Sequence, residues 1–283
     1  MELNPKPIFS IELYPPRTTP DESKLDEVHD QLASLEPDFF SVTYGAGGST
    51  KQGTKNIILK YQQLGSNMVP HLSLGGTDRD DIRILLTAYK AAGINHLVAL
   101  RGDLPPNTTT PVQHQYASEL VEFIRLETGN HFHIDVACYP EPHPDSTSYK
   151  SDIAYFKKKI DAGANSAITQ YFYNADAYFY FVDYCSKAGI SVPIVPGIMP
   201  INNYTNLKRF SAKCGAEIPH WLQKRLEGFE GDVEGLKEFG IEVVTTLCER
   251  LLAGGAPGLH FYSMNLAKSV NQIWKNLALS DRS

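Results

Sequence analysis

The chain has 283 residues, of which 42% are hydrophobic and 20% are charged, and its net charge is −6. These values are typical of a globular protein with one large domain or two small ones, and the negative charge argues against a general binder of nucleic acid or of an anionic membrane. The four cysteines form no CxxC pair, which favours reduced thiols in a cytosol over a disulfide framework or a zinc site. No signal-like segment or membrane-length apolar run is found, so we expect a cytoplasmic protein.

Strand-like apolar runs alternate with helix-like amphipathic runs eight times along the chain. The expected strands are residues 7–14, 38–45, 68–74, 96–102, 133–139, 167–173, 192–198 and 258–263. The expected helices include residues 21–35, 78–92, 117–127, 150–162, 175–188 and 233–253. Residues 214–231 do not fit this alternation, and we interpret them as an insertion.

The helix boundaries carry clear signals. Thr19-Pro20-Asp21 and Thr77 are expected to cap helix starts, and Gly93, Gly163 and Gly189 each follow an alanine just before a strand. Repeated helix–strand units imply parallel crossovers, and eight units in about 250 residues predict a (β/α)₈ TIM barrel, an α/β fold. We expect it to form a single catalytic domain over residues 1–283; a doubly wound open sheet is the alternative.

Polar residues stand at the ends of several expected strands. In the first strand the period of two puts Phe9, Ile11 and Leu13 on one face and Glu12 on the other. A carboxylate inside a barrel is costly unless it is paired or used, so we interpret it as part of an active site at the carboxyl ends of the strands. The strand ends contribute Glu12, Thr43, His71, Asp103, Tyr139 and Gln170, with Ser41, Ser73 and Asp135 deeper on the same faces.

Two other sequence features give weaker evidence for a function. The segment from Gly45 to Lys51 is rich in glycine but does not have the order of a phosphate-binding loop. His131 and His133 flank a strand start without a third ligand nearby in the sequence, so we expect no metal site there.

Seven segments resemble 5,10-methylenetetrahydrofolate reductases, in order from Phe9 to Asn265. They are IELYPPR, SVTYGAGGST, PHLS, VALRGDLPP, YPEPHPD, DAGANSAITQYFY and PGIMPINNY. The resemblance implies a catalytic barrel that binds FAD and uses NADH or NADPH. It implies a ping-pong reduction of methylenetetrahydrofolate to 5-methyltetrahydrofolate for methionine synthesis, and a homo-oligomer.

The resemblance also implies a role for particular residues. Glu12 would be the general acid that opens the imidazolidine ring of the folate, and Asp103 would lie between flavin and pterin. Gln170 would bind pterin and nicotinamide in turn, and Phe210 would stack on either ligand. The FAD-binding positions would be Thr43, His71, Arg101, Gly102, Asp103, Tyr116, Ala117, Tyr139, His143, Asp152, Lys158 and Lys159.

One departure from the family pattern concerns the folate tail. Leu266 stands where relatives often carry an arginine, and Lys268 is near it. Two rival functions remain open: a pterin-binding barrel methyltransferase without flavin, and a non-catalytic folate-binding barrel.

Overall fold

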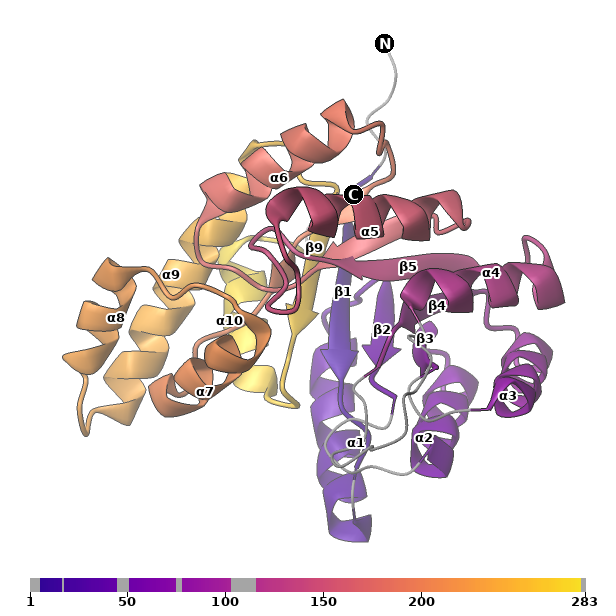
Figure 1. Cartoon of the computed structure of the whole chain (residues 1–283). Helices are drawn as coiled ribbons and strands as arrows, with labels where there is room; N and C mark the ends of the chain where they lie inside the picture. The colour runs from indigo at the N-terminus through magenta and orange to yellow at the C-terminus, as the bar shows by residue number, and fades with distance from the viewer. Residues whose placement is uncertain (1–5, 17, 45–50, 75–77, 103–115, 281–283) are drawn as a thin grey trace, which may run out of the picture.

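The computed structural model describes residues 6–16, 18–44, 51–74, 78–102 and 116–280. All strand pairs in this part of the chain are parallel, and they form one sheet in the order β7-β6-β5-β4-β3-β2-β1-β9-β8 (Figure 1). The strands are β1 (Ile8–Leu13), β2 (Phe39–Val42), β3 (Met68–Ser73), β4 (His96–Leu100), β5 (His133–Cys138), β6 (Ser166–Thr169), β7 (Ile194–Val195), β8 (Gly197–Ile198) and β9 (Gly258–Tyr262).

The two outer members of this order, β7 and β8, are consecutive in the chain and separated only by Pro196. Proline has no N–H to donate to a ladder, so the strand expected over residues 192–198 is split into two short segments. One segment pairs with β6 and the other with β9, and the Pro196 carbonyl accepts the His260 N–H at 3.0 Å. The sheet therefore closes into a (β/α)₈ barrel, which confirms the expected fold class and rules out the open sheet.

Gly197 shows how tightly the barrel closes at this point. A Cβ atom there would lie 2.2 Å from the Thr169 carbonyl oxygen and 2.6 Å from Cε2 of Tyr262. With glycine in place, the Tyr262 hydroxyl reaches the Thr169 carbonyl at 2.7 Å and bridges the barrel interior. Any larger residue would have to displace backbone.

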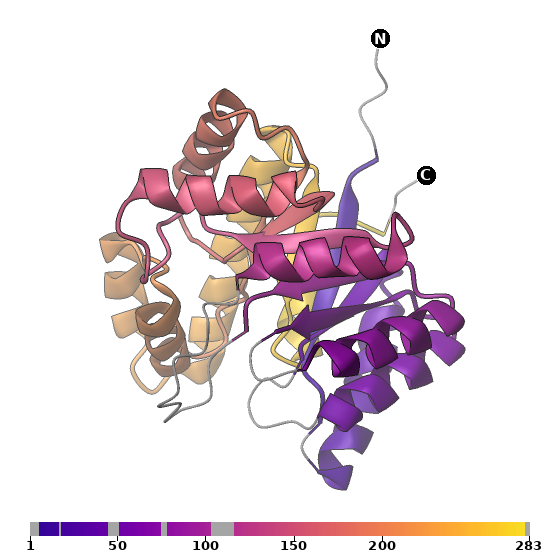
Figure 2. The same ribbon diagram turned by 45° about the vertical axis from the view of Figure 1, so that its right-hand side comes forward.

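The helices surround the barrel, and the orange helices of residues 204–253 lie on the opposite side from the purple helices α1–α3 (Figures 1 and 2). The helices are α1 (Thr19–Ala33), α2 (Lys51–Gln63), α3 (Arg79–Ala91), α4 (Ala117–Thr128), α5 (Tyr149–Asp161), α6 (Ala175–Lys187), α7 (Tyr204–Cys214), α8 (His220–Glu227), α9 (Val233–Ala253) and α10 (Ala267–Asn276). None of the helices in the described ranges is long and apolar enough to cross a membrane.

The ends of the helices correct two details of the sequence analysis. The N-cap of α1 is Thr18, one residue before the expected Thr19, and the N-cap of α3 is Asp78, whose side chain accepts the Asp80 N–H at 3.1 Å. Thr77 lies outside the described residues. The expected insertion over residues 214–231 contains α8, a short helix with Leu222 and Leu226 buried.

The alternation of side chains in β1 confirms the expected faces. Phe9, Ile11 and Leu13 belong to the large core between strands and helices, and Phe9 packs edge-on against Trp274 of α10. A smaller cluster fills part of the barrel interior and consists of Phe39, Val69, Val98 and Ile168, with Leu100 and Tyr262 packed against it. Polar side chains occupy the interior positions nearer each end of the strands.

Candidate active site

Glu12 is the buried acid at the carboxyl end of β1. Its side chain points into the barrel, since Ile11 and Leu13 on either side belong to the outer core, and the residue is only 5% exposed. Burial raises the pKa of Glu12 to about 8, although a hydrogen bond donated by the Tyr14 hydroxyl lowers it in part. A carboxyl group in this state keeps its proton at neutral pH and can act as a general acid.

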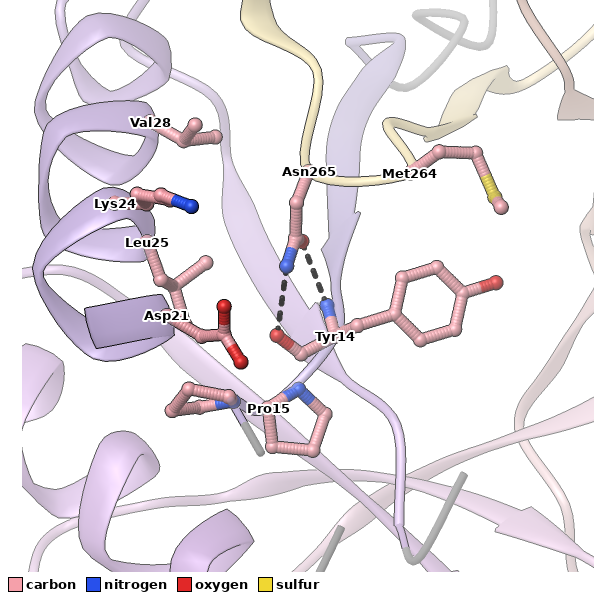
Figure 3. A pocket seen from close by; sticks show the side chains of 9 residues that line it. Tyr14, Pro15, Asp21, Lys24, Leu25, Val28, Met264 and Asn265 are labelled. Carbon is pink, nitrogen blue, oxygen red and sulfur yellow. Dashed lines mark hydrogen bonds between the residues drawn. The ribbon is translucent and has the colours of Figure 1, made fainter. Parts of the chain in front are cut away.

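The segment after β9 holds the segment that carries Glu12. Asn265 accepts the Tyr14 N–H at 2.8 Å through Oδ1 and donates to the Tyr14 carbonyl at 2.9 Å through Nδ2 (Figure 3). The Ser263 hydroxyl donates to the Glu12 carbonyl at 2.5 Å. Met264 and Asn265 have φ values of 54° and 55°, in the left-handed region that disfavours side chains with a Cβ. The backbone is therefore strained at the two residues that follow Ser263, next to the contacts that hold the Glu12 segment in place.

A cavity of about 420 Å³ lies beside the hydrogen bonds between Asn265 and Tyr14, between the strand ends and α1 (Figure 3). Its lining residues are Tyr14, Pro15, Pro16, Asp21, Lys24, Leu25, Val28, Met264 and Asn265.

Several buried polar atoms near Glu12 have no hydrogen-bond partner among the described residues. They are Thr43 Oγ1, Ser41 Oγ and His71 Nε2. Burial lowers the pKa of His71 to about 3, so its imidazole is neutral at any working pH. Its Nε2 atom lies 3.7 Å from Oε2 of Glu12, too far for a hydrogen bond. Because buried polar atoms seldom stay unpaired, these atoms are suited to contact a bound ligand.

A second group of expected site residues lies at the ends of β4 and β5. His143 donates its backbone N–H to Oδ2 of Asp152 at 3.0 Å, and its ring packs edge-on against Tyr139 at 4.7 Å. Arg101 forms an exposed ion pair with Asp145 at 3.1 Å. Burial raises the pKa of Tyr139 to about 12, although the Arg101 guanidinium lowers it in part. Gly102, just after β4, has a φ of 80°, a backbone conformation that favours glycine.

The helices α4 and α5 contribute the rest of this group. Lys159 is inward-facing and donates to the Ala137 carbonyl at 2.5 Å, and burial lowers the pKa of its ammonium group. Its neighbour Lys158 is exposed and lies 4.9 Å from the ring of Tyr155. Tyr116 stacks on the same ring at 5.3 Å and caps α4, which begins at Ala117. Lys159 thus contacts β5, whereas Lys158, Tyr155 and Tyr116 form an exposed cluster on α5 and at the start of α4.

Gln170 and Phe210 belong to different parts of the chain: Gln170 lies just after β6, and Phe210 lies within α7. Gln170 follows β6; its backbone N–H binds the Cys138 carbonyl at 2.8 Å, and its Oε1 accepts the Tyr171 N–H at 3.0 Å. Tyr171 connects this strand end to α7, because its hydroxyl lies 2.9 Å from the Ser211 hydroxyl. Phe210, the residue before Ser211, lines a cavity of about 460 Å³.

That cavity also includes the position where the sequence departs from the family pattern. Leu266 lines it together with Phe210 and Lys268. Lys268 lies 3.2 Å from Glu234, which also pairs with Lys237 at 2.7 Å. Lys268 is therefore at the cavity, as its place in the sequence suggested, but it shares a carboxylate with a second lysine.

The structure brings some of the expected residues together. Glu12 and His71 are neighbours, as are Tyr139, His143 and Asp152. Asp103 lies outside the described residues. Sequence reasoning missed Asn265, which follows the expected last strand by two residues. It also gave no role to Tyr14, although an alternating strand puts Tyr14 on the face of Glu12.

The sequence analysis was wrong about the surroundings of His133. Its ring nitrogen lies close to Nε2 of His96 and to a carboxylate oxygen of Asp135, all within 4.8 Å of one another. His96 belongs to the neighbouring strand, so the spacing along the chain could not reveal it. His131 is not part of this group, and its Nε2 faces the Ile94 carbonyl at 3.2 Å.

A closed parallel barrel with a buried, protonated acid and unpaired polar atoms at the carboxyl ends of its strands is the architecture of a (β/α)₈-barrel enzyme. The family model described as methylenetetrahydrofolate reductase matches residues 1–278. The chain belongs to the methylenetetrahydrofolate reductase family.

Individual relatives agree with the family model. The chain is 40% identical to the 5,10-methylenetetrahydrofolate reductases of Salmonella typhimurium and Escherichia coli over 271 residues, which cover 95% of this chain and 90% of each enzyme. It is 40% identical to methylenetetrahydrofolate reductase (NADH) 1 of Arabidopsis thaliana over 97% of this chain and 49% of the plant protein.

A solved structure supports the fold. It is an uncharacterized protein from Clostridium thermocellum that binds two copies of 5-methyl-5,6,7,8-tetrahydrofolic acid. It is 17% identical, with a TM-score of 0.69 over 98% of this chain and 94% of that protein.

Proposed function

We propose that this chain is an FAD-dependent reductase that converts 5,10-methylenetetrahydrofolate to 5-methyltetrahydrofolate with NADH or NADPH in a ping-pong reaction. Membership of the family supports reduction of methylenetetrahydrofolate. The single observation that carries the proposal is Glu12, a buried carboxyl group whose pKa burial raises to about 8. A barrel that only bound folate, or transferred a methyl group without forming an iminium, would have no need of this acid.

The role of Glu12 is to supply a proton to the folate. Opening the imidazolidine ring leaves electron density on the departing nitrogen, and a proton placed there favours the open iminium form of the one-carbon unit. A general acid works best when its pKa is near the working pH. The hydrogen bond donated by Tyr14 keeps the pKa of Glu12 from rising further.

The residues at the mouth fit a flavin dinucleotide. Thr43 Oγ1 and His71 Nε2 are buried and unpaired within the described part of the barrel, as expected of atoms that contact a ligand. Arg101 and Lys159 provide positive charge suited to a diphosphate, and the exposed ring of Tyr116 offers a stacking surface. The chemistry that FAD supplies when bound is hydride transfer from the nicotinamide to the folate.

The remaining FAD positions would support this group. They are Gly102, Ala117, Tyr139, His143, Asp152 and Lys158, with Asp103 in the segment outside the described residues. Asp152 holds the His143 backbone in place, and Lys158 is held over Tyr155, so both position the surface that would meet the outer parts of the cofactor.

Gln170 would serve both substrates in turn. An amide side chain has donors and an acceptor, so it suits the pterin amide face as well as the nicotinamide carboxamide. Phe210 lines the cavity of about 460 Å³, where it would stack on either flat ring. We include residues 1–283 as one catalytic domain in this proposal, supported by the closed barrel and by the family match to residue 278.

The visible absorption spectrum of the purified protein tests the proposal. A flavin band that bleaches with anaerobic NADH or NADPH, and returns when methylenetetrahydrofolate is added, is the expected result. A protein that stays colourless after incubation with FAD would leave the flavin-free methyltransferase or the folate-binding barrel instead. Comparing the bleaching rates with the two coenzymes decides between them; the plant relative is named for NADH.

A further inference from the structure

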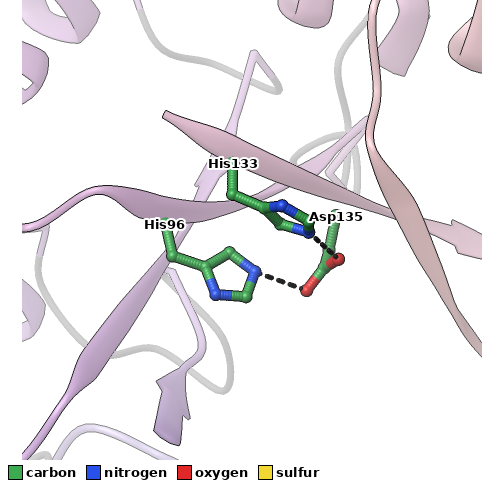
Figure 4. Close-up of side chains that lie close together, drawn as sticks. All are labelled: His96, His133 and Asp135. Carbon is green, nitrogen blue, oxygen red and sulfur yellow. Dashed lines mark hydrogen bonds and ion pairs between the residues drawn. The ribbon is translucent and has the colours of Figure 1, made fainter. Parts of the chain in front are cut away.

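Three metal-ligating side chains meet inside the barrel at the amino-terminal ends of the strands, away from the proposed active site. His96 and His133 are the first residues of β4 and β5 and are paired in the sheet, and Asp135 follows two residues later on the same face (Figure 4). One ligand atom from each lies within 4.8 Å of the other two. Nothing in the proposed reaction uses this group.

The distances in the group suit a small divalent ion. His96 Nε2 lies 2.8 Å from Oδ2 of Asp135, and His133 Nε2 lies 3.5 Å from Oδ1. In a tetrahedral zinc site, ligand atoms about 2.0–2.1 Å from the metal are about 3.3 Å from one another. The two observed separations, each to a different oxygen of Asp135, lie on either side of this value, and one ligand atom from each residue lies within 4.8 Å of the other two. Rotation of the side chains would be needed to bring the three atoms around one ion.

The carboxylate of this group is buried, and a histidine ring lies against each of its oxygens. Asp135 is 4% exposed; Oδ2 faces His96 and Oδ1 faces His133. Burying a carboxylate is costly unless such partners or a cation accompany it.

The surroundings resemble the outer contacts of a metal site. The Ser166 hydroxyl donates to Oδ1 of Asp135 and lies 2.5 Å from His133 Nε2. Phe39 packs edge-on against the His96 ring at 4.8 Å and restricts its orientation. The His133 side chain is 47% exposed, which gives an ion a path from solvent.

We propose that His96, His133 and Asp135 bind one divalent transition-metal ion of the zinc class, with solvent as the fourth ligand. Two neutral imidazoles and a carboxylate are a donor set that zinc prefers. The ion would take the place of the hydrogen bond between His96 and Asp135. Because it would link β4 to β5 at the end of the barrel opposite the strand ends that carry Glu12, its effect is on stability and not on the reaction.

The test measures metal binding to the flavin-loaded protein, produced without a polyhistidine tag and stripped with a chelator. Titration with Zn²⁺ is expected to give one ion per chain by calorimetry and metal analysis. Co²⁺ is expected to give the visible bands of a tetrahedral site, in difference spectra at wavelengths beyond the flavin bands. Zn²⁺ should raise the melting temperature of the wild type.

The variants separate the site from other histidines. His133→Asn changes a half-exposed side chain, so folding is retained, and we expect at least a tenfold loss of Zn²⁺ affinity and loss of the Co²⁺ bands. His131→Gln, two residues away and outside the group, is the matched control and should bind as the wild type does. Binding of less than half an ion per chain, or equal affinity in the His133→Asn and His131→Gln variants, would overturn the proposal and leave a hydrogen-bonded network.

Discussion

His71 Nε2 and Glu12 Oε2 lie 3.7 Å apart in the barrel interior, and the contact between them is not an ion pair at neutral pH. Burial raises the pKa of Glu12 to about 8 and lowers that of His71 to about 3. Between these values both side chains are uncharged, because the site is too poorly solvated to hold either charge. An acid that keeps its proton beside a neutral imidazole is available to donate that proton to a substrate.

The folate half-reaction should therefore depend on pH through Glu12. Its rate is expected to be flat from about pH 6 to 7.5 and to fall tenfold per unit above about pH 8, as the carboxyl loses its proton. Single-turnover rates with pre-reduced protein at each pH measure this. A rate that stays constant to pH 9.5 would show that no group with this pKa takes part.

The stability of the fold should also respond to the pKa of Glu12. A carboxyl whose pKa is raised from 4.5 to about 8 on folding gives a contribution that is fully present below pH 4.5 and lost as the pH rises to 8. Glu12→Gln removes this dependence. The melting temperature of the variant minus that of the wild type should increase between pH 5 and 8 and level off above; a difference that is constant over this range would contradict the assignment.

Tyr14 should tune this acid. Its hydrogen bond lowers the pKa of Glu12, so Tyr14→Phe is expected to raise that pKa further and to move the alkaline fall in rate to higher pH. The measurement is the same single-turnover series, with Tyr180→Phe, an exposed ring on α6, as the control. A fall that moves to lower pH, or does not move, would mean that Tyr14 does not bind the carboxylate.

Asn265 should stabilise the mouth through the Tyr14 backbone. Asn265→Ala removes two hydrogen bonds of 2.8 and 2.9 Å and places alanine at a φ of 55°, so a loss of about 2–4 kcal/mol in the free energy of unfolding is expected. Asn265→Gly removes the same bonds without the backbone penalty and should cost about 1–2 kcal/mol less. Chemical denaturation measures the stability of both variants. A glycine variant less stable than the alanine variant would contradict the proposed role of Asn265.

Much of this architecture could be predicted from local patterns. Strand alternation alone placed Glu12 on the inner face, and the recurring alanine–glycine pairs before strands revealed the repeated units that close into a barrel. These signals work because they reflect side-chain direction and backbone conformation, which neighbouring residues determine.

The rest depends on contacts between distant parts of the chain. The pairing of Asn265 with Tyr14 exists only because β9 closes against β1, and the approach of His96 to Asp135 depends on the register between β4 and β5. One continuous strand was expected over residues 192–198, and its division at Pro196 into two short strands that complete the ring follows from barrel geometry. Spacing along one segment contains none of this information.

The most direct measurement of the central claim compares the two half-reactions of Glu12→Gln by stopped-flow absorbance at the flavin band. We expect the variant to be reduced by the nicotinamide coenzyme at close to the wild-type rate, because Glu12 acts only on folate. Reoxidation by methylenetetrahydrofolate should slow by about 10²–10⁴-fold, the usual contribution of a general acid. Reoxidation at the wild-type rate, or loss of the first half-reaction instead, would contradict the role of Glu12 as the acid of the folate reaction.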